Sequence, residues 1–416
     1  MRHSVRSGIG FLYGLLLCQL SLVVSAQGNL KKGDWLGVLV RGDGQEVVFN
    51  FSIYAKGGKT VLAIRNAKEL LEVTGLVQQG DSVHFDMPFF ECRFAAGIQP
   101  DGTLSGRMTK GTAAEPQQWI FRAEPGRSQR FPVTRKAQFN VSGRWAVSIT
   151  RPNGTDRPAI AEFQQQGEHL TGTFLTPSGD YRYLEGVVSG DSLYLSAFDG
   201  SHIYLFTAKV DAEKTISGGW YYSGYGGKEK WRAVKDAQAV LPDLGYTPEV
   251  KPGAGAVDFS FPDLDSNLVS IRDPRFQGKV VVLQVMGSWC PNCMDETRFL
   301  NDYYLKHRSA GLEVLALAYE YTTDFRRSKA GLSKFRDRFK VAYPILITGV
   351  RSADSLKTEK TLPQITPIKV FPTTVYVGKD GHIRKIETGF NGPGTGIHYE
   401  AYQKEFDLTV KELLRE

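Results

Sequence analysis

Two cysteines separated by two residues, Cys290 and Cys293, are the residues of this sequence whose spacing suits chemistry best. They stand in the run Trp-Cys-Pro-Asn-Cys over 289–293, after an apolar stretch and at the start of a segment with helical periodicity. Two thiols at this spacing can close a small disulfide and reopen it. A helix N-terminus carries partial positive charge, which favours a thiolate at Cys290. The sequence therefore predicts thiol-disulfide exchange with other cysteines.

The two cysteines are expected to divide this reaction between them. Cys290, at the mouth of the helix with an exposed sulfur, would be the nucleophile, and Cys293 would resolve the mixed disulfide. Pro291 suits the first turn, where its missing N–H would have no helical partner. Asn292 is neutral and adds no charge to either thiolate. Trp289 would pack beside the sulfur and limit the access of solvent.

Glu296 is a candidate for moving the proton. It lies three residues past Cys293, and residues at this spacing share one face of a helix. Its carboxylate could take the proton from Cys293 when that thiol resolves the intermediate. A surface glutamate stabilised by the helix dipole is the alternative that the spacing leaves open.

The segment after residue 257 alternates strands and helices, which predicts a mixed sheet with helices on both faces. Strands are expected over 279–285, 312–319, 374–377 and 382–387, and a hairpin over 259–271. Helices are expected from the cysteine motif onward, with an apolar stripe over 299–307, and over 325–339 and 399–413. Gly378-Lys379-Asp380-Gly381 marks a second hairpin turn. Phe371-Pro372-Thr373-Thr374 precedes one of these strands, where a proline is permitted without special function.

Residues 30–235 contain an internal duplication. Gly33-Asp34-Trp35 recurs as Gly143-Arg144-Trp145, and Gly80-Asp81-Ser82 recurs as Gly190-Asp191-Ser192, both at an offset of 110 residues. Trp119 recurs as Trp231. A constant offset predicts two copies of one module. Short alternating strands separated by turn residues predict that both copies are all-β, as small barrels or sandwiches.

The N-terminal residues 1–26 have the pattern of a secretory signal. Arg2 and Arg6 precede an apolar run over 9–24, and small residues allow cleavage after Ala26. A membrane anchor is the alternative, although the run is short for a span of about 20 residues. We expect an exported, periplasmic protein without a stable membrane span after cleavage. The expected units are the signal (1–26), β module 1 (27–137), β module 2 (138–237), a Pro- and Gly-rich linker (238–256) and an α/β domain (257–416).

Charge and cysteine content argue against a nucleic-acid partner and against a zinc ribbon. The formal net charge of +7 is mild for 416 residues, and no basic tract with interleaved aromatics predicts a nucleic-acid partner. A zinc ribbon needs a second cysteine pair, which the sequence lacks. Cys92 stands among aromatics and is expected as a small buried hydrophobe, with pairing to another chain as the alternative. We expect no metal and no cofactor.

Residues 257–416 resemble the thioredoxin superfamily, specifically the exported thiol-disulfide oxidoreductases of the TlpA/ResA type. The resemblance rests on Gly278-Lys279-Val280-Val281, on the motif over 289–293 with Glu296, and on 371–374 followed by the turn over 378–381. It implies a thioredoxin fold. It also implies an enzyme that reduces disulfides in other proteins and carries a redox-active Cys290–Cys293 disulfide.

The resemblance also implies roles for residues around the cysteines. Pro372 would be a cis proline facing the disulfide, and Glu296 would be the active-site glutamate. The backbone of Phe371 would pair with the client peptide, with Trp289 and Thr373 also contacting the substrate.

Two positions depart from the pattern of these relatives. The family commonly has proline where this chain has Asn292, and thioredoxin has a buried aspartate where this chain has Gln284. Because an amide cannot exchange a proton near neutral pH, proton handling would fall to Glu296 or to water.

The expected direction of electron transfer and the expected partners follow from the family resemblance and not from the spacing of the cysteines. We expect a reductase supplied with electrons by a membrane thiol donor. Its clients would be proteins with disulfides or thiols, apocytochromes in cytochrome c maturation among them. Two alternatives stay open: copper binding and delivery by the Cys290 and Cys293 thiolates, and a binding protein built on the β modules with a static Cys290–Cys293 disulfide.

Overall fold

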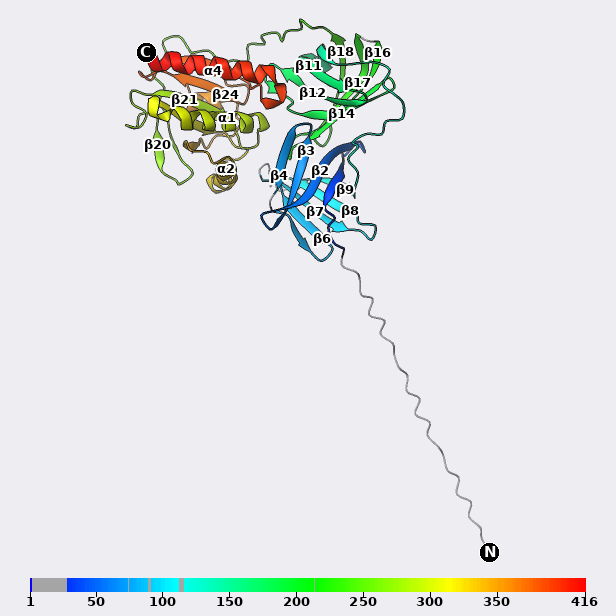
Figure 1. Ribbon diagram of the computed structural model, residues 1–416. Helices are drawn as coiled ribbons and strands as arrows, with labels where there is room; N and C mark the ends of the chain where they lie inside the picture. The colour runs from blue at the N-terminus through cyan, green and yellow to red at the C-terminus, as the bar shows by residue number, and fades with distance from the viewer. Residues whose placement is uncertain (2–27, 74, 89–90, 112–115, 213) are drawn as a thin grey trace.

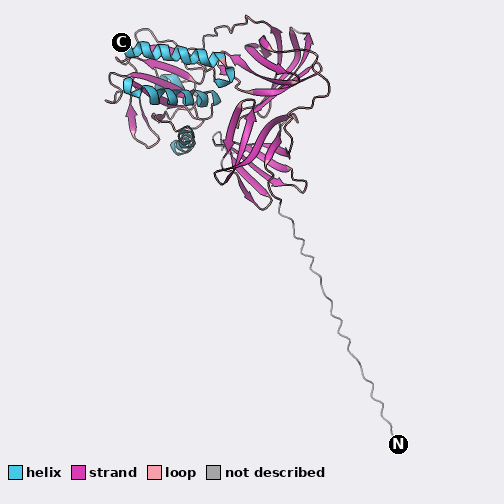
Figure 2. Cartoon of the chain, in the orientation of Figure 1, coloured by secondary structure: helices cyan, strands magenta, loops and turns pink. Residues whose placement is uncertain are grey.

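The computed structural model describes Met1 and residues 28–416, apart from 74, 89–90, 112–115 and 213. The described chain forms two β modules followed by a C-terminal α/β domain (Figure 1). Among the described residues, all four α-helices lie in the C-terminal domain, and both modules are built from strands (Figure 2). The expected signal over 1–26 falls outside the described residues except for Met1. Within the described ranges, no helix is long and apolar enough to cross a bilayer.

The α/β domain is built on a five-stranded sheet in the order β23-β22-β21-β24-β25. The sheet is mixed, because β21 pairs parallel with β22 and antiparallel with β24. Its strands are β21 (Val280–Met286), β22 (Leu312–Ala318), β23 (Ile345–Ile347), β24 (Thr373–Val377) and β25 (Ile383–Thr388). Every residue of β21 is buried, as the continuous apolar run of a central strand requires.

Helices and a hairpin cover the two faces of this sheet. Helices α1 (Pro291–His307), α2 (Phe325–Phe339) and α4 (Ile397–Arg415) bury apolar side chains on one face. The short α3 (Lys357–Thr361) and the hairpin of β19 (Ser260–Pro262) and β20 (Leu268–Ser270) lie over the other. The sequence predicted the strands and long helices to within a few residues, but not β23 or α3.

β module 1 is one antiparallel sheet of nine strands, in the order β4-β3-β2-β1-β9-β8-β7-β6-β5. The strands are β1 (Gly33–Val40), β2 (Glu46–Lys56), β3 (Lys59–Asn66), β4 (Glu69–Val73), β5 (Val77–Gln79), β6 (Ser82–Asp86), β7 (Cys92–Ile98), β8 (Leu104–Lys110) and β9 (Gln117–Pro125). Among the described residues β4 and β5 do not pair, so the curved sheet stays open as a half-barrel.

β module 2 closes into an eight-stranded barrel, because β12 pairs with both β11 and β14. Its strands are β10 (Gly143–Thr150), β11 (Asp156–Gln166), β12 (His169–Thr176), β14 (Leu184–Ser189), β15 (Ser192–Phe198), β16 (Ile203–Ala212), β17 (Thr215–Ser223) and β18 (Gly227–Lys235), with the two-residue β13 (Gly179–Asp180) beside β12. Of the two topologies that the sequence left open, the structure therefore shows barrels, one closed and one open.

The duplicated tryptophans occupy matching places in the two modules. Trp35 in β1 and Trp145 in β10 are both fully buried, and each ring N–H donates to the carbonyl four residues earlier, at 3.1 and 2.8 Å. Trp119 and Trp231 lie in the last strand of each copy, which pairs with the first. The repeated tryptophans therefore occupy equivalent strand positions in the two modules.

The open side of module 1 is covered by module 2. Phe198 of β15 is fully buried, with ring centroids 4.7 Å from Phe49 and 5.8 Å from Phe94 of module 1. Arg130, between the modules, donates to Asn50 of module 1 and to the Ser196 carbonyl of module 2. Residues of module 2 therefore complete the core of module 1, while the interior of the barrel forms a core of its own.

The predicted linker over 238–256 is irregular but does not hang free along its whole length. Val250 bridges Ile365, and the Lys251 N–H donates to the Gln364 carbonyl at 2.8 Å. The α/β domain therefore begins its contacts several residues before position 257.

Candidate functional site

The redox cysteines lie where β21 ends and α1 begins. Cys290 is the N-cap residue of α1, and the backbone N–H of Cys293 donates to its sulfur at 3.2 Å. Pro291 occupies the first turn, as its missing N–H predicts. Both cysteines are free thiols in the structure. A backbone donor aimed at the Cys290 sulfur is the arrangement that stabilises a thiolate at a helix N-terminus.

The structure corrects one expectation, because the Cys290 sulfur is not openly exposed. Cys290 is 5% exposed and Cys293 is fully buried. The Trp289 ring is fixed beside them, since its Nε1–H donates to the Tyr319 carbonyl at 2.8 Å and the ring stacks on Tyr321. Neighbouring side chains therefore cover the N-terminus of α1 and shield the cysteines from solvent.

The loop opposite the cysteines contains a cis peptide bond between Phe371 and Pro372, as the resemblance implied. The Phe371 carbonyl lies 3.8 Å from the Cys290 sulfur, so this backbone faces the reacting atom. Thr373 differs from its expected role in substrate binding. Its side chain is fully buried and donates to the Val370 carbonyl at 2.9 Å, so it points inward.

Glu296 lies beneath the cysteines and is fully buried. Thr374 Oγ1 donates to one carboxyl oxygen at 2.6 Å, and Gln284 Nε2 donates to the other at 2.7 Å. Burial raises the pKa of Glu296 to about 7, although these donors oppose the shift. A carboxyl that titrates near neutral pH can both accept and return a proton.

Gln284 holds this carboxyl in place. Its own side-chain oxygen accepts from Thr297 Oγ1 at 3.1 Å and from the Tyr343 hydroxyl at 3.2 Å. Those two donors fix the amide so that its NH₂ group faces Glu296. The glutamine therefore positions the carboxyl that handles protons and need not exchange one itself.

Burial also raises the pKa of the Cys293 thiol well above its ordinary value, and the Cys290 sulfur and the Glu296 charge add to the shift. Cys293 therefore stays protonated until a base assists it. Its burial next to Glu296 fits the resolving role that the sequence predicted.

β module 2 packs onto the redox site, which sequence reasoning missed. Ser201 Oγ donates to the Trp289 carbonyl at 3.2 Å, and Asn292 Nδ2 donates to the Asp180 carbonyl at 3.3 Å. Gly179 approaches so closely that a Cβ there would lie 2.2 Å from Asn292 Nδ2. Asn292 thus supplies an interdomain hydrogen bond that the common proline could not make.

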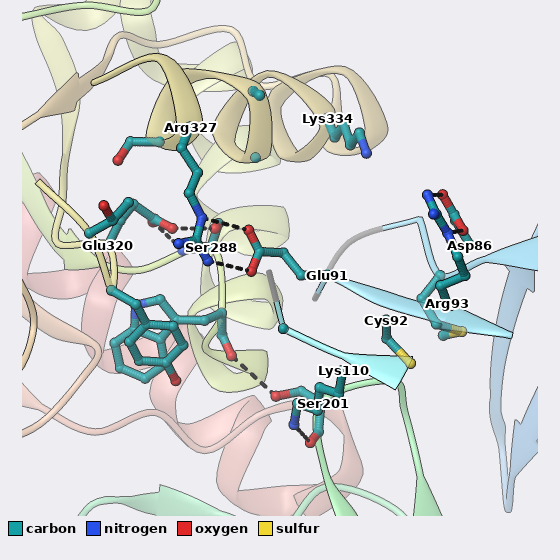
Figure 3. A pocket seen from close by; sticks show the side chains of 18 of the residues that line it. Asp86, Glu91, Cys92, Arg93, Lys110, Ser201, Ser288, Glu320, Arg327 and Lys334 are labelled. Carbon is teal, nitrogen blue, oxygen red and sulfur yellow. Dashed lines mark hydrogen bonds and ion pairs between the residues drawn. The ribbon is translucent and has the colours of Figure 1, made fainter. Parts of the chain in front are cut away.

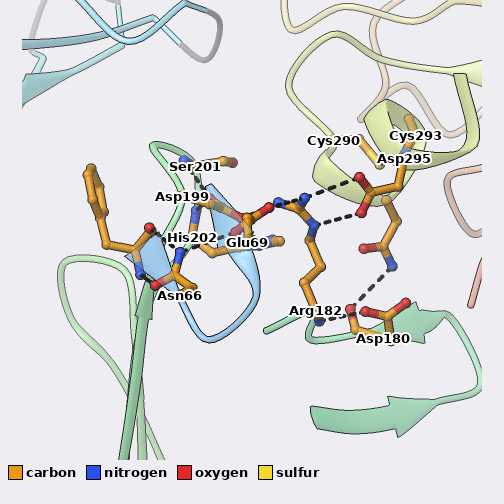
Figure 4. Close-up of polar contacts among 12 residues, drawn as sticks. Asn66, Glu69, Asp180, Arg182, Asp199, Ser201, His202, Cys290, Cys293 and Asp295 are labelled. Carbon is orange, nitrogen blue, oxygen red and sulfur yellow. Dashed lines mark hydrogen bonds and ion pairs between the residues drawn. The ribbon is translucent and has the colours of Figure 1, made fainter. Parts of the chain in front are cut away.

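A buried charge cluster joins all three domains at this point (Figure 4). Arg182 of module 2 contacts Glu69 of module 1, Asp199 of its own module at 3.0 Å and Asp295 of α1 at 2.8 Å. All four side chains are almost completely buried. No local sequence pattern predicts this cluster, because Glu69 and Asp295 each lie more than a hundred residues from Arg182 in the chain.

Two carboxyls of this region are protonated more readily than usual. Burial raises the pKa of Glu69 to about 7 and that of Asp180 to about 6. The Asp180 carboxyl accepts from the Gly392 N–H of the α/β domain at 2.6 Å. The contact between module 2 and the α/β domain therefore contains titratable groups.

Cys92 behaves as the sequence predicted. It is 3% exposed, and burial raises the pKa of its thiol to about 12. A buried thiol of this kind is a small hydrophobe with little reactivity. Within the described ranges, no group of three or more His, Cys, Asp or Glu side chains is arranged to hold a metal ion.

Comparison with known proteins places the α/β domain in a family. The Redoxin family model matches residues 251–401. The chain is 30% identical over 159 residues to the thiol-disulfide oxidoreductase ResA of Geobacillus thermodenitrificans (strain NG80-2), covering 36% of this chain and 82% of that relative. It is 24% identical over 155 residues to ResA of Bacillus subtilis (strain 168), covering 35% and 77%.

A solved structure gives a similar match. The thiol:disulfide interchange protein of the thioredoxin family from Chlorobium tepidum TLS is 18% identical, with a TM-score of 0.31, and the match covers 40% of this chain and 99% of that one. The Redoxin match contains both redox cysteines, Glu296 and the cis-proline loop, and leaves the β modules outside it. Through its C-terminal domain, which the Redoxin model matches, the chain belongs to the ResA-type thiol-disulfide oxidoreductases.

Proposed function

We propose that this protein is an exported thiol-disulfide oxidoreductase that reduces disulfides in other proteins. The observation that carries the proposal is the environment of the Cys290 sulfur, 3.2 Å from the Cys293 amide nitrogen and 3.8 Å from the Phe371 carbonyl. The amide stabilises negative charge on the attacking sulfur. The carbonyl belongs to a loop whose backbone can pair with the segment that carries the client sulfur.

The first step is attack by the Cys290 thiolate on one sulfur of a client disulfide. The client S–S bond breaks, a bond forms between Cys290 and the client, and the other client sulfur leaves as a thiolate that takes up a proton. Trp289 and the Phe371 loop border the sulfur and confine the approach of the client.

The second step is resolution by Cys293. Its proton passes to the Glu296 carboxylate, and the thiolate attacks the Cys290 sulfur. The Cys290–Cys293 disulfide forms as the bond between Cys290 and the client breaks, and the second client sulfur leaves as a thiolate that takes up a proton. The client has then gained two electrons and two protons, which the two cysteines have lost.

A further dithiol must return the electrons. The signal-like segment over 1–26 supports export to the periplasm. An exported protein does not meet cytosolic reductant, so we propose that a membrane thiol donor reduces the Cys290–Cys293 disulfide. Clients would be exported proteins with disulfides or thiols, and apocytochromes belong to this class.

Trapping of clients tests the proposal. Cys293→Ser removes the resolving thiol, so we expect it to accumulate mixed disulfides through Cys290 that a reductant releases. Cys290→Ser should trap nothing, and Cys92→Ser, the control thiol outside the motif, should behave as the unaltered protein. Equal absence of trapped clients in all variants, with a persistent Cys290–Cys293 disulfide in the unaltered protein, would instead favour a static bridge.

A further inference from the structure

A cleft opens beside the redox cysteines, between module 1 and the α/β domain (Figure 3). Its volume is about 710 Å³, within the range that holds a short peptide or a drug-sized ligand. Ser288 and Trp289, the two residues before Cys290, line it. Tyr321, which stacks on Trp289 and is 62% exposed, forms an aromatic shelf at the same end.

The cleft reaches the residues next to Cys290 in the chain, because Ser288 and Trp289 line it. Module 2 already covers the other neighbour of Cys290, because Asn292 bonds to the Asp180 carbonyl and Gly179 lies against it. A client that reaches the sulfur in this arrangement therefore passes over Trp289 and Tyr321. Its flanking residues would then lie in the cleft.

The walls of the cleft come from different domains and carry many charges. Module 1 contributes Asp86, Glu91, Arg93 and Lys110, and the α/β domain contributes Glu320, Arg327 and Lys334. Two ion pairs cancel four of these: Asp86 with Arg93 at 2.8 Å, and Glu91 with Arg327 at 3.1 Å. The second pair spans the cleft from one domain to the other.

The remaining charges leave an excess of positive charge. Glu320 accepts from the Ser288 N–H at 2.8 Å and from its hydroxyl at 2.7 Å, and burial raises the pKa of this carboxyl. Lys334 is exposed on α2, and Lys110 donates to the Ser201 carbonyl. In the described part of the chain neither lysine forms an ion pair within 4 Å, although the charge of Lys334 helps to lower the pKa of Asp86 and burial lowers the pKa of Lys110.

We propose that this cleft binds the polypeptide segment that flanks the disulfide of a client protein, and that it selects segments with acidic side chains. The inference rests on the proposed function and adds the substrate class. An acidic side chain would meet Lys334 and Lys110, while an apolar or aromatic neighbour would lie on the Trp289–Tyr321 shelf. Module 1 thus acts as a specificity wall for the chemistry of the α/β domain.

The test uses the reduced full-length protein and three disulfide-bonded peptides that differ only beside the cysteine, with Glu, Gln or Lys. We expect the second-order rate constant at low ionic strength to be about fivefold higher for the acidic peptide than for the basic one. Added salt should shrink the difference, because it screens the lysines.

Lys334→Glu should reverse the order of the acidic and basic peptides. Arg326→Glu is the matched control, because it makes the same charge change on an exposed residue of α2 that does not line the cleft. It should leave the preference unchanged. Lys110→Gln, a milder change in the opposite wall, should reduce the preference without reversing it.

Hydroxyethyl disulfide, a small neutral substrate, distinguishes failure of the cleft proposal from failure of the proposed function. If the protein reduces it but shows no charge preference, or if Lys334→Glu and Arg326→Glu act alike, the cleft proposal is overturned and the proposed function stands. If neither the peptides nor this substrate is reduced, the proposed function itself fails.

Discussion

Among the single residues, Glu296 accepts the proton of Cys293, and Gln284 holds the Glu296 carboxyl in its orientation. The carboxyl is buried, receives two short hydrogen bonds, and has a pKa raised to about 7. Above this pKa the Glu296 carboxylate can accept the Cys293 proton, and below it the Glu296 carboxyl is already protonated. Resolution of the mixed disulfide should therefore accelerate as pH rises from about 6 to 8.

Glu296→Gln should remove this acceleration and slow resolution at pH 8 on the order of 100-fold, the scale of a general base. Attack by Cys290 should continue at its normal rate. Single-turnover mixing with a disulfide peptide, followed by acid quench, measures both steps. Asp302→Asn, an exposed carboxyl on the same helix, is the control. A pH-independent resolution step in the unaltered protein would remove Glu296 from the mechanism.

The same carboxyl links stability to pH. Because its folded pKa lies above the ordinary value, it stabilises the fold fully at pH below about 4.5 and loses this contribution as pH rises through about 7. Neutral Gln keeps the shape without the buried charge. Glu296→Gln should therefore raise the melting temperature relative to the unaltered protein at pH 8 and not at pH 4, by differential scanning calorimetry. Equal shifts at both pH values would contradict the assignment.

Among the helices and strands, local sequence patterns predict those features that burial and helix capping determine. The apolar run of β21, the cap at Cys290 and the repeated tryptophans could all be found in the sequence, because burial and capping leave a short-range signature. Thr373 was assigned to the client on family grounds. It points inward because every residue of β24 is buried, and its hydroxyl donates to the Val370 carbonyl.

The closure of module 1 could not be found in this way. Its half-barrel is completed by Phe198 from the other copy, a contact between residues far apart in sequence that no period in either copy specifies. The Arg182 cluster is a second example, since each member is an ordinary charged residue until three domains meet.

Phe198→Ala should loosen module 1 although the residue belongs to module 2. Removing a fully buried phenylalanine costs about 3–5 kcal/mol, and here the cavity opens against Phe49 and Phe94. Hydrogen-exchange mass spectrometry should show faster exchange in β1–β3, with the barrel strands β10 and β11 protected. Phe206→Ala, in the barrel core, should give the opposite pattern. Exchange that changes only in module 2 would contradict the shared core.

In the whole molecule, the β modules pack against the redox domain through hydrogen bonds and a buried charge cluster. Arg182 is the central contact, since its guanidinium offsets carboxylates from three domains. Breaking a buried ion pair costs about 3–5 kcal/mol, because charges stay buried without a partner. Arg182→Gln should therefore separate the modules from the α/β domain.

Small-angle X-ray scattering should show a larger radius of gyration for Arg182→Gln, and protease should cut the 238–248 segment faster. Arg157→Gln is the matched control, because Arg157 pairs with Glu229 inside module 2 and bridges no domains. An Arg182→Gln protein as compact as the control would show that the cluster does not hold the domains together.

Docking should also weaken with rising pH. The pKa values of Glu69 and Asp180 are raised to about 7 and about 6 in the docked form. Their stabilising contribution is complete below about pH 4 and is lost as pH rises through these values. The radius of gyration should increase between pH 5 and 8, and Glu69→Gln should reduce that increase. A radius that falls over this range would contradict the assigned direction.

If Cys290 and Cys293 exchange two electrons with the disulfide of another protein, the thiols gained and lost on the two proteins can be counted. The reduced protein is mixed with an equal amount of a disulfide-bonded client, quenched in acid, and tagged for mass spectrometry. We expect two thiols to vanish from this chain, at Cys290 and Cys293, while two form on the client and Cys92 keeps its thiol. Unchanged thiols on both proteins, or loss of the Cys92 thiol in place of the pair, would contradict it.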